Sequence, residues 1–311
     1  MTRVAAVDCG TNSIRLLVAD ADVHGSLHEL DRRMEIVRLG QDVDATGAFA
    51  PEALRRTFAA CDAYAEVIAS YGVDRVRFVA TSAARDVSNA GEFFAGVRER
   101  FGVDPDVISG ADEAVLSFRG ATEGLAELAV QAPYLVVDIG GGSTELVLGD
   151  PDGVRHAQSI DMGSVRMTER YLRSDPPTAE EVAKASAEID SLLKATTVPV
   201  RKARSLVGVA GTITTVAAVA LELPEYDRSR VHHARIAGPR LTETVSWLVS
   251  STRAERAQRK AIHPGRIDVI GAGALIVERL HRLVAPTLAA DELLVSEHDI
   301  LDGAALSLLD R

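Results

Sequence analysis

The chain has 311 residues, of which 47% are hydrophobic and 25% charged, and its formal net charge at pH 7 is -11. This length suggests two domains, each large enough for its own core, and the composition is typical of a water-soluble globular protein. The negative charge argues against binding to nucleic acid or to an anionic membrane, so a polyanionic ligand would need a local basic patch.

Two features bear on the compartment in which the protein works. The two cysteines, Cys9 and Cys61, lie among apolar neighbours and have neither CxxC nor metal-ligand spacing. We interpret both as reduced core thiols, which indicates a reducing compartment. Asp8, Asn12 and Arg15 interrupt the N-terminal apolar run too early for a signal peptide or a membrane span. The sequence therefore predicts a cytoplasmic protein.

The chain opens with a predicted strand, glycine turn and second strand. Residues 4–7 and 14–19 are apolar and flank the segment Asp8-Cys-Gly-Thr-Asn12-Ser13, a pattern that predicts paired strands around a tight turn. Consecutive N–H groups in such a turn can form a concave anion site. Residues 27–39 are expected to add a further strand.

The next elements are a helix and a strand that ends in a polar turn. Pro51 is expected to begin a helix that carries one apolar stripe and ends at Gly72. A short strand over 75–80 then leads into Thr81-Ser-Ala-Ala-Arg85-Asp86. In open α/β sheets, ligands bind at this end of the strands. The guanidinium of Arg85 can therefore donate hydrogen bonds to two phosphate oxygens. The alternative is a surface ion pair with Asp86.

A pair of acids opens the following helix. After a helix near 91–101 and a brief strand over 106–108, the sequence Ser109-Gly-Ala-Asp112-Glu113 is expected to begin a helix that continues toward Leu128. Acids in a first turn commonly complement the helix dipole. Glu113 could instead act as a general base if it lies close to the glycine turns.

The chain is organised around the stretch from Tyr134 to Leu148. An apolar run ends at Asp138, three glycines (Gly140, Gly141 and Gly142) and Ser143 follow, and a second apolar run begins after Glu145. This predicts a strand, a glycine turn and a strand. Two carboxylates beside a phosphate-binding turn imply a bridging divalent cation, because bare carboxylates would repel the phosphate. The alternative is an ordinary glycine-rich hairpin.

The two glycine turns are copies of one unit. Asp8-Cys-Gly-Thr-Asn-Ser-Ile-Arg-Leu-Leu-Val-Ala-Asp20 aligns without gaps with Asp138-Ile-Gly-Gly-Gly-Ser-Thr-Glu-Leu-Val-Leu-Gly-Asp150, and five positions are identical. We interpret this match as a duplicated domain. Two such turns facing each other across a cleft would hold a small ligand between the domains.

The second half continues with strands and helices of the same kind. A strand is expected over 154–160, and Thr178-Ala-Glu-Glu181 has the pattern of a capping box at the start of a helix. Residues 205–209 are strand-like and lead through Ala210-Gly211-Thr212 into an apolar helix over 214–221. This third turn could offer helix N–H groups to an anion, or could serve only for packing.

Basic residues cluster near the C-terminal end of the chain. Arg253, Arg256 and Arg259 or Lys260 recur at helical spacing, with Arg266 beyond them. This predicts a basic helix face that either attracts a long polyanion or is simply solvated.

The last stretch also contains a false dinucleotide motif. The segment Val269-Ile-Gly-Ala-Gly-Ala-Leu-Ile276 lacks the third glycine of a dinucleotide fingerprint and follows too short a strand, so we reject that reading. A strand over 293–295 and a helix over 299–309 complete the predicted elements.

Five motifs follow one another along the chain, and together they resemble one known family. They are Asp8-Cys-Gly-Thr-Asn-Ser, Thr81-Ser-Ala-Ala-Arg85, Ser109-Gly-Ala-Asp-Glu113-Ala, Asp138-Ile-Gly-Gly-Gly-Ser-Thr-Glu145 and Ala210-Gly-Thr212. This set resembles the exopolyphosphatase and guanosine pentaphosphate phosphohydrolase (Ppx/GppA) family of the actin and sugar-kinase superfamily. The resemblance implies an α/β fold of two ribonuclease H-like domains with an interdomain cleft.

We expect the first domain to span 1–125 and the second to span 126–296, with a C-terminal helix over 297–311 that packs back on the first. The chain resembles a short two-domain form, since it ends without the helical C-terminal domains of longer family members. This puts in doubt processive action on very long chains and a dimer built through those domains, and a homodimer of another kind is left open.

The resemblance also assigns roles to individual residues. Glu113 matches the family's catalytic glutamate, which activates water, and Arg85 matches its phosphate-contacting arginine. Asp138 and Glu145 match the acids that hold Mg²⁺, with Mn²⁺ as an alternative metal, and Asp8 is expected to join them through water. The matching phosphate-binding residues are Asn12, Ser13, Gly140, Gly141, Gly142, Ser143, Gly211 and Thr212.

The implied activity is hydrolysis of the terminal phosphate of inorganic polyphosphate, with short chains favoured. Removal of the 5′ terminal phosphate of guanosine pentaphosphate is the nearest alternative. A sugar-type kinase and a non-enzymatic sensor of polyphosphate or a nucleotide are further alternatives. A monovalent cation is left open, and no nucleic acid or membrane is expected as a partner.

Overall fold

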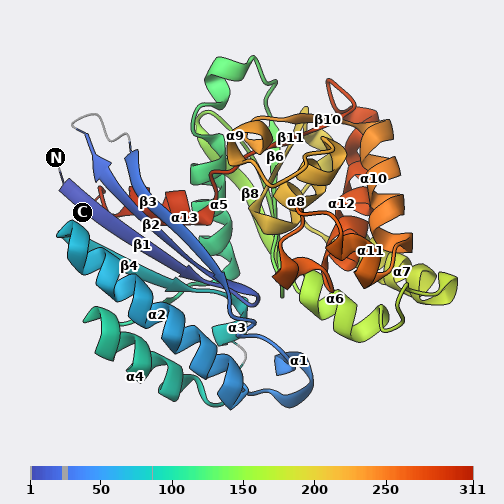
Figure 1. Ribbon diagram of the computed structural model, residues 1–311. Helices are drawn as coiled ribbons and strands as arrows, with labels where there is room; N and C mark the ends of the chain where they lie inside the picture. Colours follow the sequence, from blue (N-terminus) through green and yellow to red (C-terminus); the bar gives the residue numbers. More distant parts are fainter. Residues whose placement is uncertain (1, 23–26, 86, 311) are drawn as a thin grey trace. The chain divides into compact units, whose positions relative to one another are not determined.

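The computed structural model describes residues 2–22, 27–85 and 87–310, which divide into two compact units (Figure 1). Unit 1 comprises Met1–Gly120 and Ile300–Arg311, and unit 2 comprises Ala121–Asp299. The boundaries expected from the sequence lie at residues 125 and 296. Each unit contains one sheet and its own core.

The unit 1 sheet has five strands in the order β3-β2-β1-β4-β5. The strands are β1 (Thr2–Cys9), β2 (Ser13–Ala21), β3 (Leu27–Ile36), β4 (Arg75–Ala80) and β5 (Asp106–Val107). β2 runs antiparallel to β1 and β3, whereas β4 is parallel to β1 and to β5. The five predicted strands are confirmed. β3 ends before the predicted residue 39 because the amides of Val37 and Arg38 both turn back to the carbonyl oxygen of Asn12, at 3.1 and 2.9 Å.

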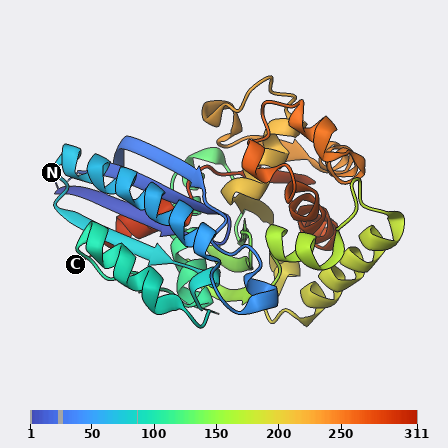
Figure 2. The same ribbon diagram turned by 60° about the horizontal axis from the view of Figure 1, so that its bottom comes forward.

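Helices cover both faces of this sheet. They are α1 (Val43–Thr46), α2 (Pro51–Tyr71), α3 (Ser82–Arg85), α4 (Ala90–Phe101), α5 (Gly110–Thr122) and α13 (Ile300–Ser307). Figure 2 shows α2 and α4 side by side over one face, where they pack against Val7 and Phe78. On the other face α13, the red helix of Figure 1, packs against Val4 and Leu17. Because successive strand residues point to opposite faces, a sheet covered twice has continuous apolar strands.

The unit 2 sheet has six strands in the order β10-β11-β9-β6-β7-β8. The strands are β6 (Tyr134–Ile139), β7 (Thr144–Asp150), β8 (Gly153–Ile160), β9 (Ser205–Val209), β10 (Arg235–Ala237) and β11 (Glu292–Val295). β7 is antiparallel to β6 and β8, and β9 is parallel to β6 and to β11. Apart from the added edge strand β10, which the sequence analysis missed, the strands repeat the order and directions of unit 1. The predicted two-domain α/β fold is confirmed.

The core of unit 2 is built around two buried helices, α8 (Ala210–Ala220) and α12 (Ile270–Val284). The other helices are α6 (Ser164–Tyr171), α7 (Ala179–Ala195), α9 (Arg228–Val231), α10 (Gly238–Ser250) and α11 (Arg253–Ala257), with short 3₁₀ turns at Leu125–Leu128, Val200–Lys202, Pro264–Arg266 and Ala285–Thr287. The capping box at the start of α7 is confirmed, since Thr178 and Glu181 exchange side-chain and backbone hydrogen bonds.

Two sequence predictions about helices are wrong. The helix expected to continue toward Leu128 ends at Thr122, because Gly124 adopts a left-handed conformation with φ 77° before a 3₁₀ turn. The prediction of a basic helix face is also wrong, because α11 ends at Ala257. Arg256 is buried near Asp175, and the guanidinium of Arg259 lies 4.3 Å from the ring centre of Trp247.

Other expectations hold. α12 begins at Ile270 after the 3₁₀ turn Pro264–Arg266, so the 269–276 segment follows a turn and not the strand of a dinucleotide fingerprint. Cys9 and Cys61 are free and buried, and burial raises the pKa of both thiols, that of Cys61 to about 12. Among the described residues, no helix is both long enough and apolar enough to cross a membrane.

One glycine contact gives a stability test for unit 1. A Cβ atom at Gly303 in α13 would collide with the backbone carbonyl of Leu116 in α5. Gly303→Ala should therefore push the two helices apart and lower the free energy of unfolding by about 1–3 kcal/mol. Urea denaturation followed by circular dichroism measures this change.

The matched control is Gly91→Ala in α4, where an added Cβ would meet no atom within 4 Å. It should be neutral or slightly stabilising, within about 1 kcal/mol, because alanine favours helix more than glycine does. Equal stability of the two variants would contradict the tight contact between α13 and α5.

Candidate functional site

The two glycine turns have the same backbone hydrogen bond. The amide of Gly140 donates to the carbonyl oxygen of Ser143 at 3.0 Å, where β6 passes into β7. In unit 1 the amide of Gly10 donates to the carbonyl oxygen of Ser13, also at 3.0 Å. The duplication predicted from the sequence is therefore present in local geometry as well as in strand order.

The start of α6 braces the unit 2 turn. The amide of Ser164 donates to the carbonyl oxygen of Gly140 and that of Val165 to Gly141, both at 2.9 Å. The guanidinium Nε of Arg166 donates to the carbonyl oxygen of Gly142, also at 2.9 Å. With three successive carbonyl oxygens held by one helix, the groups that this turn can offer an anion are amide N–H groups other than that of Gly140, which donates to Ser143.

Two further glycines let the surrounding segments come this close. A Cβ at Gly163 would collide with the backbone of Gly141. A Cβ at Gly273 in α12 would lie 2.5 Å from Cγ2 of Thr212 and 3.2 Å from Cβ of Ser164. Gly273 therefore lies where α6 meets the turn between β9 and α8. The structure thus brings the predicted residues of the 140–143 turn close to Gly211 and Thr212.

The β9–α8 turn carries a cation that the sequence analysis did not place there. Ala210 is left-handed with φ 65°, and a Cβ at Gly211 would collide with the guanidinium of Arg266. Arg266 Nη1 donates to Oγ1 of Thr215 at 3.2 Å, and this hydroxyl donates to the carbonyl oxygen of Gly211 at 2.6 Å. Arg266 therefore adds positive charge beside a predicted phosphate-binding turn.

Asp138 and Glu145 lie directly opposite each other on the antiparallel strands β6 and β7. Their exposed fractions are 6% and 1%. Ser159 on β8 donates from Oγ to Oε1 of Glu145 at 2.7 Å. Two buried like charges in directly opposite positions are destabilising unless a cation or hydrogen bonds compensate.

The donor set fits a hard divalent cation. Carboxylate oxygens are the ligands that Mg²⁺ prefers, and Mg²⁺ in phosphate-handling sites is usually bound by one or two carboxylates, waters and substrate phosphate. Among the described residues there is no group of three or more His, Cys, Asp or Glu side chains suited to a metal. Asp138 and Glu145 would therefore supply only part of the coordination sphere, which agrees with that pattern.

In unit 1 the glycine turn is joined to α3. Oγ1 of Thr11 lies 3.1 Å from Oγ of Ser82, and the carbonyl oxygen of Thr11 accepts from the amide of Gly40 at 2.8 Å. Asn12 and Ser13, the predicted phosphate-binding residues, lie in this braced turn and are partly exposed. The turn is therefore held on both sides.

Glu113 is held by Arg85. Glu113 is 7% exposed in the first turn of α5, and its Oε2 accepts from Nη1 of Arg85 at 2.9 Å. The same nitrogen donates to the carbonyl oxygen of Ile108 at 3.0 Å. Asp112 instead hydrogen-bonds to Ser109 at the helix start. The alternative partner of Arg85 considered from the sequence, Asp86, lies outside the described residues.

Asp8 has a basic partner. It is 4% exposed, and its Oδ2 accepts from Nε of Arg15 at 3.0 Å and from Nη2 at 2.6 Å. Arg15 was not among the predicted site residues. Its position in the repeat, which matches that of Glu145, was the available signal.

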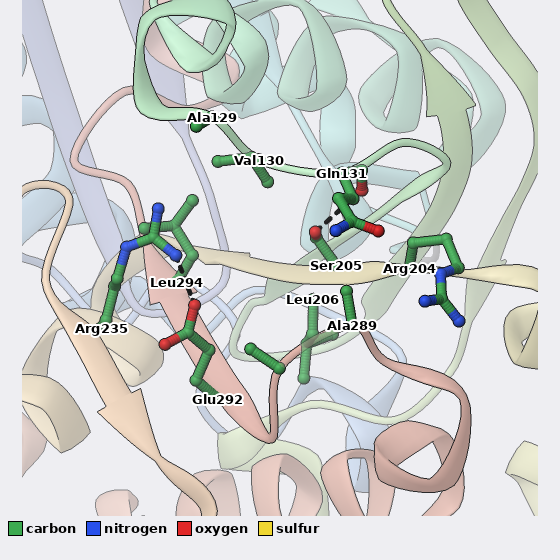
Figure 3. Close-up of a pocket in the computed structure, with 11 residues that line it drawn as sticks. Ala129, Val130, Gln131, Arg204, Ser205, Leu206, Arg235, Ala289, Glu292 and Leu294 are labelled. Carbon is green, nitrogen blue, oxygen red and sulfur yellow. Dashed lines mark hydrogen bonds and ion pairs between the residues drawn. The ribbon is translucent and has the colours of Figure 1, made fainter.

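A small pocket lies at the other edge of the unit 2 sheet, where β9 and β11 begin (Figure 3). Its volume is about 130 Å³, and its lining residues are Ala129, Val130, Gln131, Arg204, Ser205, Leu206, Arg235, Ala289, Ala290, Glu292 and Leu294. Arg235 pairs with Glu292, and Ser205 donates to the carbonyl oxygen of Gln131 at 2.8 Å. This pocket contains none of the predicted site residues.

Comparisons with known proteins agree with the motifs. Exopolyphosphatase 2 of Mycobacterium tuberculosis is 51% identical to this chain, over 99% of each sequence. The crystal structure of an exopolyphosphatase-like protein superposes with a TM-score of 0.95 at 44% identity, covering 99% of this chain and 97% of that chain.

A second solved structure, the Ppx/GppA family member of Aquifex aeolicus, has a TM-score of 0.82 and 30% identity, covering 99% of this chain and 97% of that chain. The family model described as the Ppx/GppA phosphatase family matches residues 17–308. The chain therefore belongs to the Ppx/GppA phosphatase family.

Proposed function

We propose that this protein is an exopolyphosphatase that hydrolyses the terminal phosphoric anhydride bond of inorganic polyphosphate, with short chains favoured. The observation that carries the proposal is the buried Asp138 and Glu145 pair beside a glycine turn whose carbonyl oxygens are held by α6. Such a turn offers N–H groups to phosphate, and its acids offer oxygen ligands to a metal. The relative named exopolyphosphatase 2 supports this substrate class.

Asp138 and Glu145 are the residues that would hold Mg²⁺, or Mn²⁺ in its place. When bound there, the cation would neutralise phosphate oxygens as negative charge develops on them. Ser159 would orient the carboxylate of Glu145 through its 2.7 Å hydrogen bond. Residues next to metal ligands commonly fix the orientation of those ligands in this way.

Phosphate-binding groups are proposed within each unit taken by itself. In unit 2 they are the Gly140, Gly141, Gly142 and Ser143 turn and the Gly211 and Thr212 turn, with Arg266 adding charge at the second. In unit 1 they are Asn12, Ser13 and Arg85. Phosphoryl transfer depends mainly on positioning and on charge neutralisation, so no covalent intermediate is required.

Glu113 is proposed as the general base that takes the proton of the attacking water. It is buried, and the hydrogen bond from Arg85 fixes the direction of its carboxylate. A base must be fixed within hydrogen-bonding reach of the water that it activates. Arg85 would in this way orient Glu113 as well as contact phosphate.

The free, buried thiols Cys9 and Cys61 support a cytoplasmic setting.

The first prediction tests the base. Glu113→Gln should lower kcat by at least about 100-fold with KM almost unchanged, because it keeps the size of the side chain and removes the proton acceptor. Steady-state release of phosphate from tripolyphosphate measures both constants. The matched control is Asp112→Asn, its exposed neighbour on the same helix turn, which should stay close to wild type. Near-wild-type kcat in Glu113→Gln would remove Glu113 from the chemistry.

The second prediction tests the metal role of Asp138. Asp138→Asn should raise the Mg²⁺ concentration for half-maximal activity by at least about tenfold, since an amide is a weaker ligand for a hard cation than a carboxylate. A Mg²⁺ titration at saturating substrate gives this value. Asp150→Asn, at the far end of the neighbouring strand β7, is the control. Superposable titrations of wild type and Asp138→Asn would count against the assignment.

The third prediction concerns the substrate. Phosphate release measured in parallel from tripolyphosphate, long-chain polyphosphate and guanosine pentaphosphate should give the highest kcat/KM with tripolyphosphate. A preference for guanosine pentaphosphate would instead assign the alternative activity of the family. Formation of a phosphorylated product from an added acceptor alcohol, without release of phosphate, would indicate a kinase, and binding with neither release nor transfer would indicate a sensor.

A further inference from the structure

Three strand ends lie in a row at one edge of the unit 1 sheet. β4 is parallel to β1 on one side and to β5 on the other, with Ala80 paired with Cys9 and with Val107. Parallel neighbouring strands end at the same edge, where open α/β sheets bind their ligands. The glycine turn follows β1, α3 follows β4, and the start of α5, with Glu113, follows β5. α3 therefore continues the middle strand, between the predicted phosphate-binding turn and the proposed base.

The first residue of α3 contacts the glycine turn through two hydroxyl groups. Oγ1 of Thr11 in the turn lies 3.1 Å from Oγ of Ser82, and both residues are buried, 8% and 4% exposed. The backbone of Thr11 is also fixed, because its carbonyl oxygen accepts from the amide of Gly40 at 2.8 Å. A buried hydroxyl that loses its partner is costly, so this contact holds α3 against the turn.

The last residue of α3 holds the proposed base. Nη1 of Arg85 donates to Oε2 of Glu113 at 2.9 Å and to the carbonyl oxygen of Ile108 at 3.0 Å. Ile108 is tied in turn to β4, since its amide donates to the carbonyl oxygen of Ala80 at 3.1 Å. Hydrogen bonds at the two ends of α3 thus connect the glycine turn to Glu113.

α3 is too short to fix its own direction. It has only the four residues Ser82–Arg85, and a single helical turn gains few internal hydrogen bonds for the dihedral angles that it fixes. Its middle residues, Ala83 and Ala84, are small and pack into the core of unit 1. The direction of α3 therefore depends on this packing and on the contacts at its two ends. A tilt at the first residue would displace the guanidinium at the last.

We infer that Thr11 and Ser82 are positioning residues for hydrolysis, which fix α3 so that Arg85 holds Glu113 at a set distance from phosphate in the unit 1 turn. All four residues belong to unit 1. The attacking water must be placed in line with the phosphate, and a displacement of about 1 Å can lower the rate by about 100-fold. This inference rests on the roles proposed above for Glu113 as the base and for the turn in binding phosphate.

Steady-state release of phosphate from tripolyphosphate by the full chain with Mg²⁺ tests this role. Thr11→Val removes one hydroxyl and nearly keeps the shape of the side chain, and Ser82→Ala removes the other. Each should lower kcat about tenfold and change KM by less than about threefold, because the amide groups of the turn remain. The double variant should also lose about tenfold and not about a hundredfold, since both substitutions break the same contact.

A conservative variant and a matched control accompany these two. Thr11→Ser returns a hydroxyl to the same place and should recover kcat to within about threefold of wild type. The control is Thr57→Val in α2, where a buried hydroxyl donates to the carbonyl oxygen of Ala53 at 2.9 Å. It should keep the wild-type kcat. Melting curves followed by circular dichroism establish that each variant is folded at the assay temperature.

A further variant shows whether Ser82 acts through the base. Added to Glu113→Gln, Ser82→Ala should lower kcat by less than about twofold more, because the group that it positions has already been lost. A further tenfold loss would show that Ser82 acts independently of Glu113 and would overturn the inference. Unchanged kcat in Thr11→Val and Ser82→Ala, additive losses in the double variant, or an equal loss in Thr57→Val would overturn it as well.

The same measurements separate this role from the proposed chemistry. If Glu113→Gln keeps the wild-type kcat, the proposed base fails, and the role of the two hydroxyls fails with it. If Glu113→Gln is inactive while Thr11→Val and Ser82→Ala match wild type, the base stands and only the role of Thr11 and Ser82 fails.

Discussion

Two buried carboxylates that face each other across neighbouring strands are the constraint on which the rest of this structure depends. The register of β6 and β7 places Asp138 opposite Glu145, with both side chains shielded from water. Two like charges in such positions need compensation, which a bridging cation would supply. Their place at the end of a glycine turn supports the proposal that this turn binds a metal together with an anion.

The packing around that pair is set by small residues. Gly163 lets α6 contact the backbone of the 140–143 turn, and Gly273 lets α12 approach Thr212 and Ser164. Each of these glycines lies where a side chain would push apart two segments that the candidate site requires together. The segment Gly271-Ala-Gly273, which superficially resembles a dinucleotide motif, is thereby explained as helix packing. The motif is a consequence of how the site is assembled.

Much of the fold could be predicted because the sequence repeats itself. The matching turns at Asp8 and Asp138 predict two α/β units, and the two sheets indeed share strand order and direction. The capping box at Thr178 depends only on residues close together in the sequence, and it was confirmed. The basic helix face was not, because helical spacing alone did not reveal that α11 ends at Ala257 and that Arg256 is buried.

The candidate site could be predicted only in part, because contacts between residues far apart in the sequence cannot be read from it. Glycines, acids and their spacing are visible in a sequence, and they predicted the turns, whereas the role of Glu113 came from the resemblance of its motif to the family. The partners of those groups depend on strand register and on long-range packing. Ser159 meets Glu145 through the β7 and β8 pairing, and Arg266 meets Gly211 although 55 residues separate them (266 − 211). Arg15 was visible in the repeat, but its ion pair with Asp8 became apparent only with the pairing of β1 and β2.

The most direct test of this account is the crystal structure of the Glu113→Gln variant with Mn²⁺ and tripolyphosphate, with the metal located by its anomalous scattering. The account predicts one anomalous peak, between Asp138 and Glu145, in contact with a phosphate that accepts hydrogen bonds from the 140–143 turn. A peak away from this pair, or a phosphate chain bound away from that turn, would contradict it.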